Sequence, residues 1–161
     1  SGLVLDGLRP GVGLERSVYT YNQGTVLGLE TELAHSGAGV HAERVHRLVG
    51  AVDEHLATED VLHTHGGGDG GLFSGILARY LAVVVRTLPG TTAAADEART
   101  TATRLVLSSA RAAWVHREQT PAGPVFSADW AGAAHGPEGD LSVQLGAWML
   151  LEAAVAVCTG G

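Results

Sequence analysis

The segment YTYNQGTVLG (residues 19–28) concentrates side chains that can donate and accept hydrogen bonds. Tyr21, Asn22 and Gln23 follow one another directly ahead of an apolar run, and Asn22 is the only asparagine among 161 residues. Amides and tyrosine hydroxyls both donate and accept, and aromatic rings pack on apolar faces, so this combination suits a polyhydroxylated ligand such as a sugar. The structural alternative is that Asn22 caps a helix and Tyr21 fills the core.

Neighbouring acidic residues are the other candidates for chemistry, at 53–54, 59–60 and 96–97. Two carboxyl groups that act as nucleophile and acid/base must lie about 5 to 5.5 Å apart across the bond that they cleave. Adjacent side chains on a helix diverge by about 100°, so such pairs do not face each other. We therefore assign these acids to the solvated surface and assign no catalytic residue.

The segment HTHGGGDGG (residues 63–71) is expected to be a flexible loop and not a metal site. His63, His65 and Asp69 lie beside glycines, and no further histidine or cysteine cluster lies at local spacing. The segment also lacks the Lys-Ser/Thr of a phosphate-binding loop. No metal and no cofactor are predicted.

The charge of the chain and its apolar runs limit the partners. A net charge of −7 leaves no basic patch for nucleic acid. The longest apolar run, residues 145–157, is shorter than the ~20 residues that a membrane span needs and contains Glu152, so we predict a soluble chain without a span. No signal segment is visible, and the compartment stays open. All ten basic residues are arginine, which is typical of a GC-rich, for example actinobacterial, genome.

Hydrophobic periodicity predicts an all-α fold of five helices with no convincing strand. The third and fifth helices are apolar nearly all round, whereas the second has one apolar face, and Trp114 is placed on the buried side of the fourth. This alternation indicates concentric layers with too little chain to close them. The inner helices are predicted at residues 21–35, 72–88 and 141–157, and the outer helices at residues 40–56 and 92–116.

Five sequence blocks resemble the second half of glycoside hydrolase family 76, the endo-α-1,6-mannanases, which adopt an (α/α)6 barrel. The blocks are LVLDGL (3–8), YTYNQG (19–24), LFSGILARYL (72–81), FSADWAG (126–132) and a terminal helix that contains Gln144. Ser74 stands where the family commonly carries a lysine, and the adjacent catalytic aspartates of the family are absent. The resemblance implies that residues 1–161 are the C-terminal half of such a domain, a partial barrel of about five helices.

The resemblance further implies a wall of a sugar cleft without the bond-breaking residues. The substrate-binding residues that it implies are Asp6, Tyr21, Asn22, Gln23, Phe73 and Trp130, with Gln144 holding other cleft residues in place. For Asp6 the alternative is simple turn chemistry, and for Phe73 and Trp130 it is a packed core.

The implied ligand is α-mannan or a mannooligosaccharide, and the implied partner is a missing N-terminal half or a second copy. We expect this partner against the face that bears Leu77, Leu145 and Trp148, because a large apolar patch is normally covered. Two other functions stay open: a half-barrel that binds sugar without cutting it, and another α/α-toroid enzyme such as a sugar epimerase.

Overall fold

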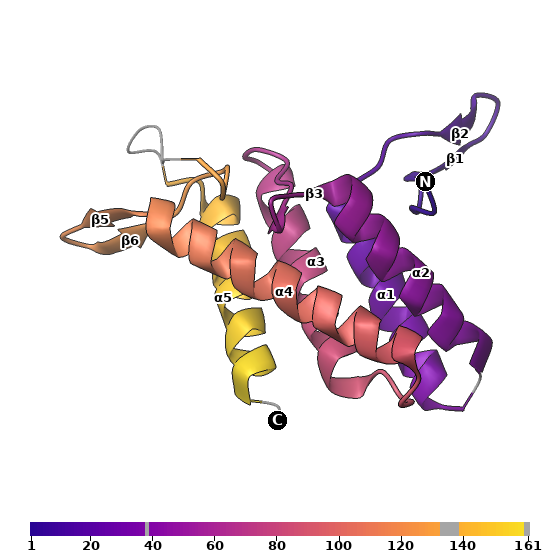
Figure 1. The fold of residues 1–161 in the computed structure, drawn as a ribbon. Coiled ribbons are helices and arrows are strands. Elements are labelled where there is room, and N and C mark those ends of the chain that lie inside the picture. The colour runs from indigo at the N-terminus through magenta and orange to yellow at the C-terminus, as the bar shows by residue number, and fades with distance from the viewer. Residues whose placement is uncertain (38, 133–138, 160–161) are drawn as a thin grey trace.

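The computed structural model describes residues 1–37, 39–132 and 139–159. Within them the chain forms five helices and three two-stranded antiparallel hairpins (Figure 1). The helices are α1 (Thr20–His35), α2 (Gly39–Leu56), α3 (Gly70–Thr87), α4 (Ala93–His116) and α5 (Leu141–Thr159). The hairpins pair β1 (Gly7–Arg9) with β2 (Gly13–Glu15), β3 (Ala57–Thr58) with β4 (Val61–Leu62), and β5 (Glu118–Thr120) with β6 (Gly123–Val125).

All five predicted helices are present, and their ends differ from the expected ones by at most two residues. The expectation of no strand is wrong for the three hairpins, although none of them interrupts a predicted helix. Strands of two or three residues are too short to show a period of two in the sequence. The β3–β4 turn also gives no sequence signal, because Glu59 and Asp60 hold φ of +50° and +68°, where Asn-Gly is usual.

The helices form two layers, as the alternation of apolar patterns predicted. Helices α1, α3 and α5 make one layer in which α3 lies between the other two, and α2 and α4 cover it from one side (Figure 1). Helix α2 packs on α1 and α4, and α4 packs on α3 and α5. The inner helices all begin at the same end of the molecule, as two contacts show. Thr20 Oγ1 of α1 lies 3.1 Å from Ser74 Oγ of α3. Gly68 N, just before α3, lies 2.6 Å from Oδ2 of Asp140, just before α5.

Glycines let the inner helices approach one another at backbone distance. A Cβ added to Gly24 of α1 would lie 2.9 Å from Leu77 Cα of α3. A Cβ added to Gly75 of α3 would lie 2.5 Å from the carbonyl oxygen of Gly146 in α5. Each inner-helix contact therefore depends on the absence of a side chain at these positions.

The core corrects two expectations about single residues. Leu77, placed by the sequence on the open face, is fully buried, because it packs under α1 at Gly24. Trp114, expected on the buried side of α4, is 45% exposed, and the guanidinium of Arg117 lies 3.8 Å from the centre of its ring. The expected open face does hold Leu145 and Trp148 of α5, which are 46% and 66% exposed.

Two of the inner helices, α3 and α5, are long and apolar enough to cross a membrane by length and composition alone. Helix α3 packs against α1, α4 and α5, which is the arrangement of a core helix.

Candidate functional site

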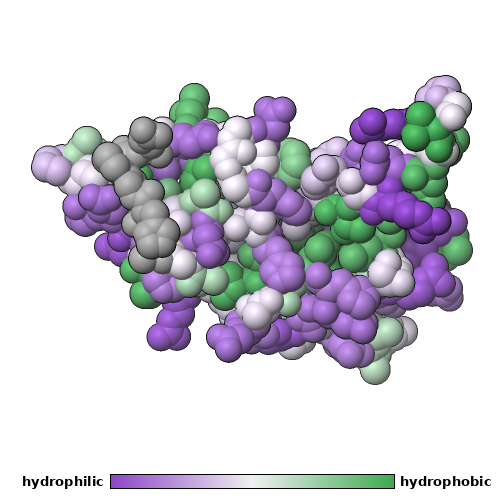
Figure 2. Space-filling view, turned by 90° about the horizontal axis from the view of Figure 1, so that it is seen from above, coloured by the Kyte–Doolittle hydropathy of each residue, from purple (hydrophilic) through white to green (hydrophobic). Residues whose placement is uncertain are grey.

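The residues singled out by the sequence gather at the end where the inner helices begin. Three segments enter this end: residues 3–6 before the β1–β2 hairpin, residues 63–69 before α3, and residues 126–132 after β6. Figure 2 views the molecule from this end and shows a hydrophobic area near the projecting β1–β2 hairpin, bordered by hydrophilic residues. Apolar and hydrogen-bonding surface thus meet here.

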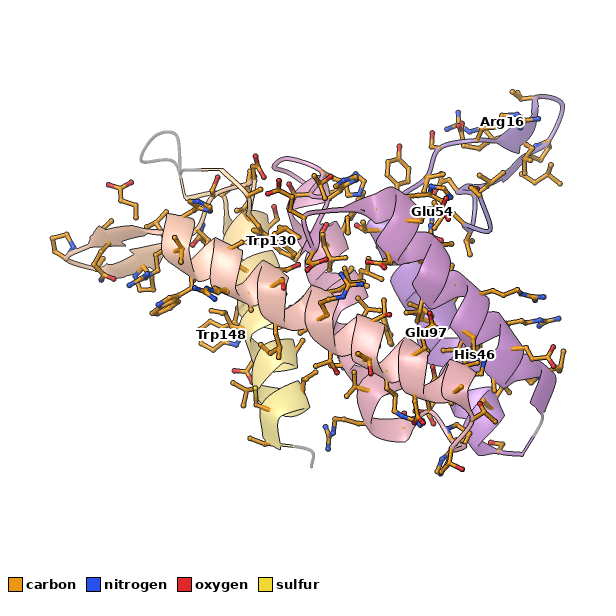
Figure 3. The ribbon with its side chains drawn as sticks, viewed as in Figure 1. Arg16, His46, Glu54, Glu97, Trp130 and Trp148 are labelled. Atoms are coloured by element: carbon orange, nitrogen blue, oxygen red, sulfur yellow. The ribbon has the colours of Figure 1, made fainter. Side chains whose placement is uncertain are left out.

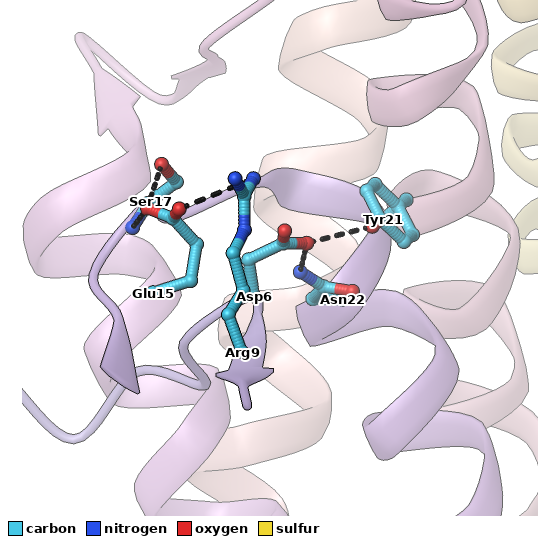
Figure 4. Close-up of polar contacts among 6 residues, drawn as sticks. All are labelled: Asp6, Arg9, Glu15, Ser17, Tyr21 and Asn22. Carbon is cyan, nitrogen blue, oxygen red and sulfur yellow. Dashed lines mark hydrogen bonds and ion pairs between the residues drawn. The ribbon is translucent and has the colours of Figure 1, made fainter. Parts of the chain in front are cut away.

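Asp6 joins Tyr21 and Asn22 into one hydrogen-bonded group (Figure 4). Tyr21 Oη donates to Asp6 Oδ1 over 2.9 Å, and Asn22 Nδ2 donates to the same oxygen over 3.0 Å. The bonds from Asn22 and Tyr21 lower the pKa of Asp6, and the bond to Asp6 raises the pKa of Tyr21. The group therefore presents a carboxylate, a neutral phenol and an amide, which together donate and accept.

The helix-cap alternative for Asn22 is wrong. The N-cap residue of α1 is Tyr19, whose side chain makes no capping bond, and Asn22 lies within the first turn. The turn alternative for Asp6 does not describe its side chain either. The backbone N–H of Asp6 donates to Ser17 O over 2.9 Å at the base of the hairpin, whereas its carboxylate accepts hydrogen bonds from α1. Both side chains are partly exposed.

A second polar group on the hairpin extends the first (Figure 4). Glu15 Oε1 accepts from Ser17 Oγ over 2.9 Å and from Ser17 N over 3.3 Å, and these bonds lower the pKa of Glu15. Arg9 Nη2 lies 3.3 Å from Glu15 Oε2. The hairpin thus holds one more carboxylate and a guanidinium near Asp6.

Four aromatic side chains pack together beside Asp6. The ring of Phe73 from α3 lies 4.6 Å from that of Tyr21, 5.5 Å from that of Tyr19 and 5.6 Å from that of His65, between centroids. His65 Nε2 accepts from Thr20 N over 3.3 Å, and burial lowers the pKa of this imidazole. Both observations describe a neutral ring, so the aromatic group is uncharged.

The structure thus brings together Asp6, Tyr21, Asn22 and Phe73, four of the six residues that the sequence singled out. Trp130 (labelled in Figure 3) is separate: it is 3% exposed, and its carbonyl oxygen lies 3.0 Å from Nδ1 of His116, the last residue of α4. This geometry favours the packed-core alternative for Trp130, because its ring has no free face.

Gln23, the sixth residue, lies under the group and not on its surface. Its side chain is fully buried, its Oε1 accepts from Val4 N over 2.8 Å, and its Nε2 donates to Val4 O and Tyr19 O, both over 2.9 Å. The amide has no N–H left for a ligand. Gln144 contacts Phe126 in the same manner, as expected for a residue that holds others in place.

Sequence reasoning missed Tyr19, His65 and Asp140 as parts of this end. Asp140 Oδ2 accepts from Gly68 N over 2.6 Å, and its Oδ1 accepts from Ser142 N and Oγ over 2.8 and 2.6 Å. An acidic residue just before an apolar helix is a usual N-cap signal, which would have found Asp140. Its contact with Gly68, 72 residues away, has no sequence signal.

Asp140 predicts a loss of stability in acid. The bonds from Ser142 and Gly68 lower the pKa of Asp140 from 3.8 to about 2. Because the folded state holds this proton more weakly than the unfolded state, the stabilisation is complete above the unfolded pKa and is lost as pH falls from about 4 to about 2. Urea unfolding across this range should give a flatter pH dependence for Asp140→Asn than for the native chain. An unchanged slope would contradict the bonding seen at Asp140.

Three of the acidic residues set aside by the sequence contact arginines. Asp53 and Asp60 both contact the guanidinium of Arg104, Asp53 at 2.8 Å, and Asp96 pairs with Arg99 at 2.5 Å. Across residues 1–37, 39–132 and 139–159, no three His, Cys, Asp or Glu side chains come together as metal ligands. The side chains gathered around Asp6 offer hydrogen-bonding groups and aromatic rings.

Comparisons with known proteins bear on the family and the fold of the chain. The family model described as "Glycosyl hydrolase family 76" matches residues 1–157. The GH76A α-1,6-mannanase from Salegentibacter sp. HEL1_6 is 33% identical with a TM-score of 0.84 over 98% of this chain and 46% of the mannanase. An inactive variant of that enzyme, with two aspartates replaced by alanine and in complex with α-1,6-mannotetrose, is 32% identical over the same shares, with the same TM-score.

The Lin0763 protein from Listeria innocua is 22% identical with a TM-score of 0.83 over 99% of this chain and 44% of that protein, which shows the fold alone. The comparison with curated proteins gave no significant match. The chain spans less than half the length of each of these solved structures.

Proposed function

Because this chain belongs to glycosyl hydrolase family 76, we propose that Asp6, Tyr21, Asn22 and Phe73 form one wall of a cleft that binds α-1,6-linked mannose polymers. The observation that carries the proposal is the hydrogen-bonded group around Asp6, which adjoins the packed rings of Tyr21 and Phe73. A pyranose has hydroxyls at its rim and C–H groups on its faces, and it needs both kinds of partner. The crystallised relative in complex with α-1,6-mannotetrose supports the choice of ligand.

The roles within the wall follow from the hydrogen-bond donors and acceptors that each side chain has left for a ligand. The oxygen Oδ2 of Asp6 makes no hydrogen bond to the described residues, so it can accept from sugar hydroxyls. Asn22 uses one N–H on Asp6 and keeps its second N–H and its Oδ1. The Asp6 bonds fix both partners before the ligand arrives, which reduces the entropy that binding must remove.

Cleavage of the glycosidic bond is assigned to residues outside this chain. A retaining mechanism needs two carboxyl groups about 5 to 5.5 Å apart. Two carboxylates of this end, Asp6 and Glu15, are held in their charged forms by hydrogen bonds, so neither suits the acid role. We propose that the intact enzyme supplies an adjacent pair of aspartates from its other half.

This proposal predicts binding without hydrolysis. We expect the chain to bind α-1,6-mannotetraose in calorimetry, with little affinity for the α-1,4-linked glucose tetramer maltotetraose as control. Incubation with α-1,6-mannan should release no reducing ends. Binding of neither oligosaccharide would refute the cleft wall, and mannan digestion by the chain alone would show that its catalytic residues have been overlooked.

We propose that the other half of the same fold covers the open side of the inner helices. That side holds a hollow of about 610 Å³ whose walls include Trp148 of α5. Its charged residues are Arg79 and Arg86 on the middle helix, Glu32 on α1 and Glu152 on α5, and none of them forms an ion pair with the described residues. Two copies placed face to face with their α3 helices opposed would bring the arginines of both helices together, whereas Glu32 and Glu152 lie on the flanking helices, and this disfavours such a homodimer. We expect a partner that places carboxylates opposite Arg79 and Arg86.

The chain by itself should therefore remain a monomer with an open apolar face. We expect sedimentation velocity to report one monomeric species in 0.15 M salt, and a hydrophobic dye to bind the chain. Trp148→Glu should reduce dye binding, because it replaces a large exposed apolar side chain of the open face with a charge. A stable dimer that Trp148→Glu dissociates would instead assign this face to a second copy.

A further inference from the structure

Two glutamines make the same pair of contacts at two different inner helices. Gln23 is the fourth residue of α1 and Gln144 is the fourth residue of α5. Gln23 accepts from Val4 N over 2.8 Å and donates to Val4 O over 2.9 Å. Gln144 accepts from Phe126 N over 2.9 Å and donates to Phe126 O over 3.0 Å. In each case one side-chain amide binds both the N–H and the C=O of a single residue, Val4 or Phe126. Each of these residues belongs to a segment that passes over the start of the helix, called a crossing segment below.

The third inner helix, α3, binds the backbone of its crossing segment through a hydroxyl group. Ser74, the fifth residue of α3, is 2% exposed, and its Oγ donates to His63 O over 2.6 Å. Two residues further along the chain, His65 accepts from the first N–H of α1. All three helices thus hold the backbone of a crossing segment with a polar side chain in their first turns.

We propose that Gln23 is a positioning residue that fixes Asp6 in the sugar-binding wall and does not touch the sugar, an inference that rests on the proposed function of that wall. Only Leu5 separates Val4 from Asp6, so anchoring both backbone groups of Val4 sets where the Asp6 side chain begins. The second anchor is the bond from Asp6 N to Ser17 O over 2.9 Å. Between these two anchors the carboxylate is aimed at Tyr21 and Asn22.

The chemistry of the amide explains why glutamine is needed here. Val4 offers one donor and one acceptor, and a buried backbone group left without a partner is costly. A glutamine amide satisfies both groups at once, as a neighbouring β-strand would. A carboxylate can only accept, and a methionine of similar length can satisfy neither group. The second N–H of Gln23 binds Tyr19 O, which ties the crossing segment to the start of α1.

The experiment compares Gln23→Met with Gln144→Met, two variants that remove the same kind of contact at different helices. The Asp6 carboxyl is titrated by carbon-13 NMR in each folded variant. Because the low pKa of Asp6 depends on its bonds from Asn22 and Tyr21, we expect Gln23→Met to raise it toward 3.8 and Gln144→Met to leave it unchanged. Affinity for α-1,6-mannotetraose should fall about tenfold or more in Gln23→Met.

If Gln23→Met does not fold, Gln23→Asn takes its place, because its shorter amide cannot reach both backbone groups of Val4 and adds no charge near Asp6. A rise in the pKa of Asp6 in that variant supports the proposal. An unchanged Asp6 titration in a folded Gln23 variant overturns it, as does an equal rise in Gln144→Met. The titration needs no sugar, so failure of the native chain to bind mannotetraose would refute the cleft wall while the role of Gln23 is still decided.

Discussion

Gly75→Ala should destabilise the chain by about 3 kcal/mol, as overpacking between rigid elements does. The added methyl group would lie 2.5 Å from the carbonyl oxygen and 2.8 Å from the Cα of Gly146. Both atoms belong to the backbone of α5, so no side-chain rotation can relieve the collision, and α3 and α5 must separate. Urea unfolding followed by circular dichroism measures the loss.

Gly50→Ala is the matched control for Gly75→Ala. Gly50 lies inside α2 and is exposed, and a Cβ there would meet no atom within 4 Å. Alanine is the better helix former by about 1 kcal/mol, so this variant should be more stable than the native chain. If Gly75→Ala were as well tolerated as Gly50→Ala, the close contact between α3 and α5 would be wrong.

Asp6→Ala should weaken the binding of α-1,6-mannotetraose by about tenfold or more. The substitution removes an acceptor for the sugar and frees Tyr21 and Asn22, whose side chains then must be ordered when the ligand binds. Calorimetry measures the affinity, and thermal unfolding shows whether the fold is kept.

Asp69→Ala is the control for Asp6→Ala. Asp69 is exposed at the same end of the molecule, and its side chain does not cap α3. The substitution removes the same charge without touching the bonded group, so affinity should change little. Equal effects of both variants would mean that only the net charge of this end matters, which would contradict the assigned role of Asp6.

The helices were predictable from the sequence because their signals are local. The change from helices apolar all round to helices with one apolar face gave both the layers and their order. The hairpins were not predictable, since Glu59 and Asp60 occupy a turn that normally selects Asn-Gly. Trp114 and Leu77 were misplaced because apolar character alone does not say which neighbour covers a residue.

The candidate site was predictable only where its residues are adjacent in the chain. Tyr21 and Asn22 stand side by side, and the family resemblance added Asp6 and Phe73. The direction of a side chain was not predictable: Gln23 follows Asn22 directly but points under the wall to Val4. One step along a helix turns a side chain by about 100°, which here separates a surface residue from a buried one.

The most direct test of the cleft wall is an NMR titration of the chain with α-1,6-mannotetraose, followed at individual residues. The account predicts that the signals of Tyr21, Asn22 and Phe73 shift first and together, and that signals from the open face around Trp148 do not move. Shifts confined to Trp148 and its neighbours, or no shift at all at saturating oligosaccharide, would contradict the cleft wall proposed here.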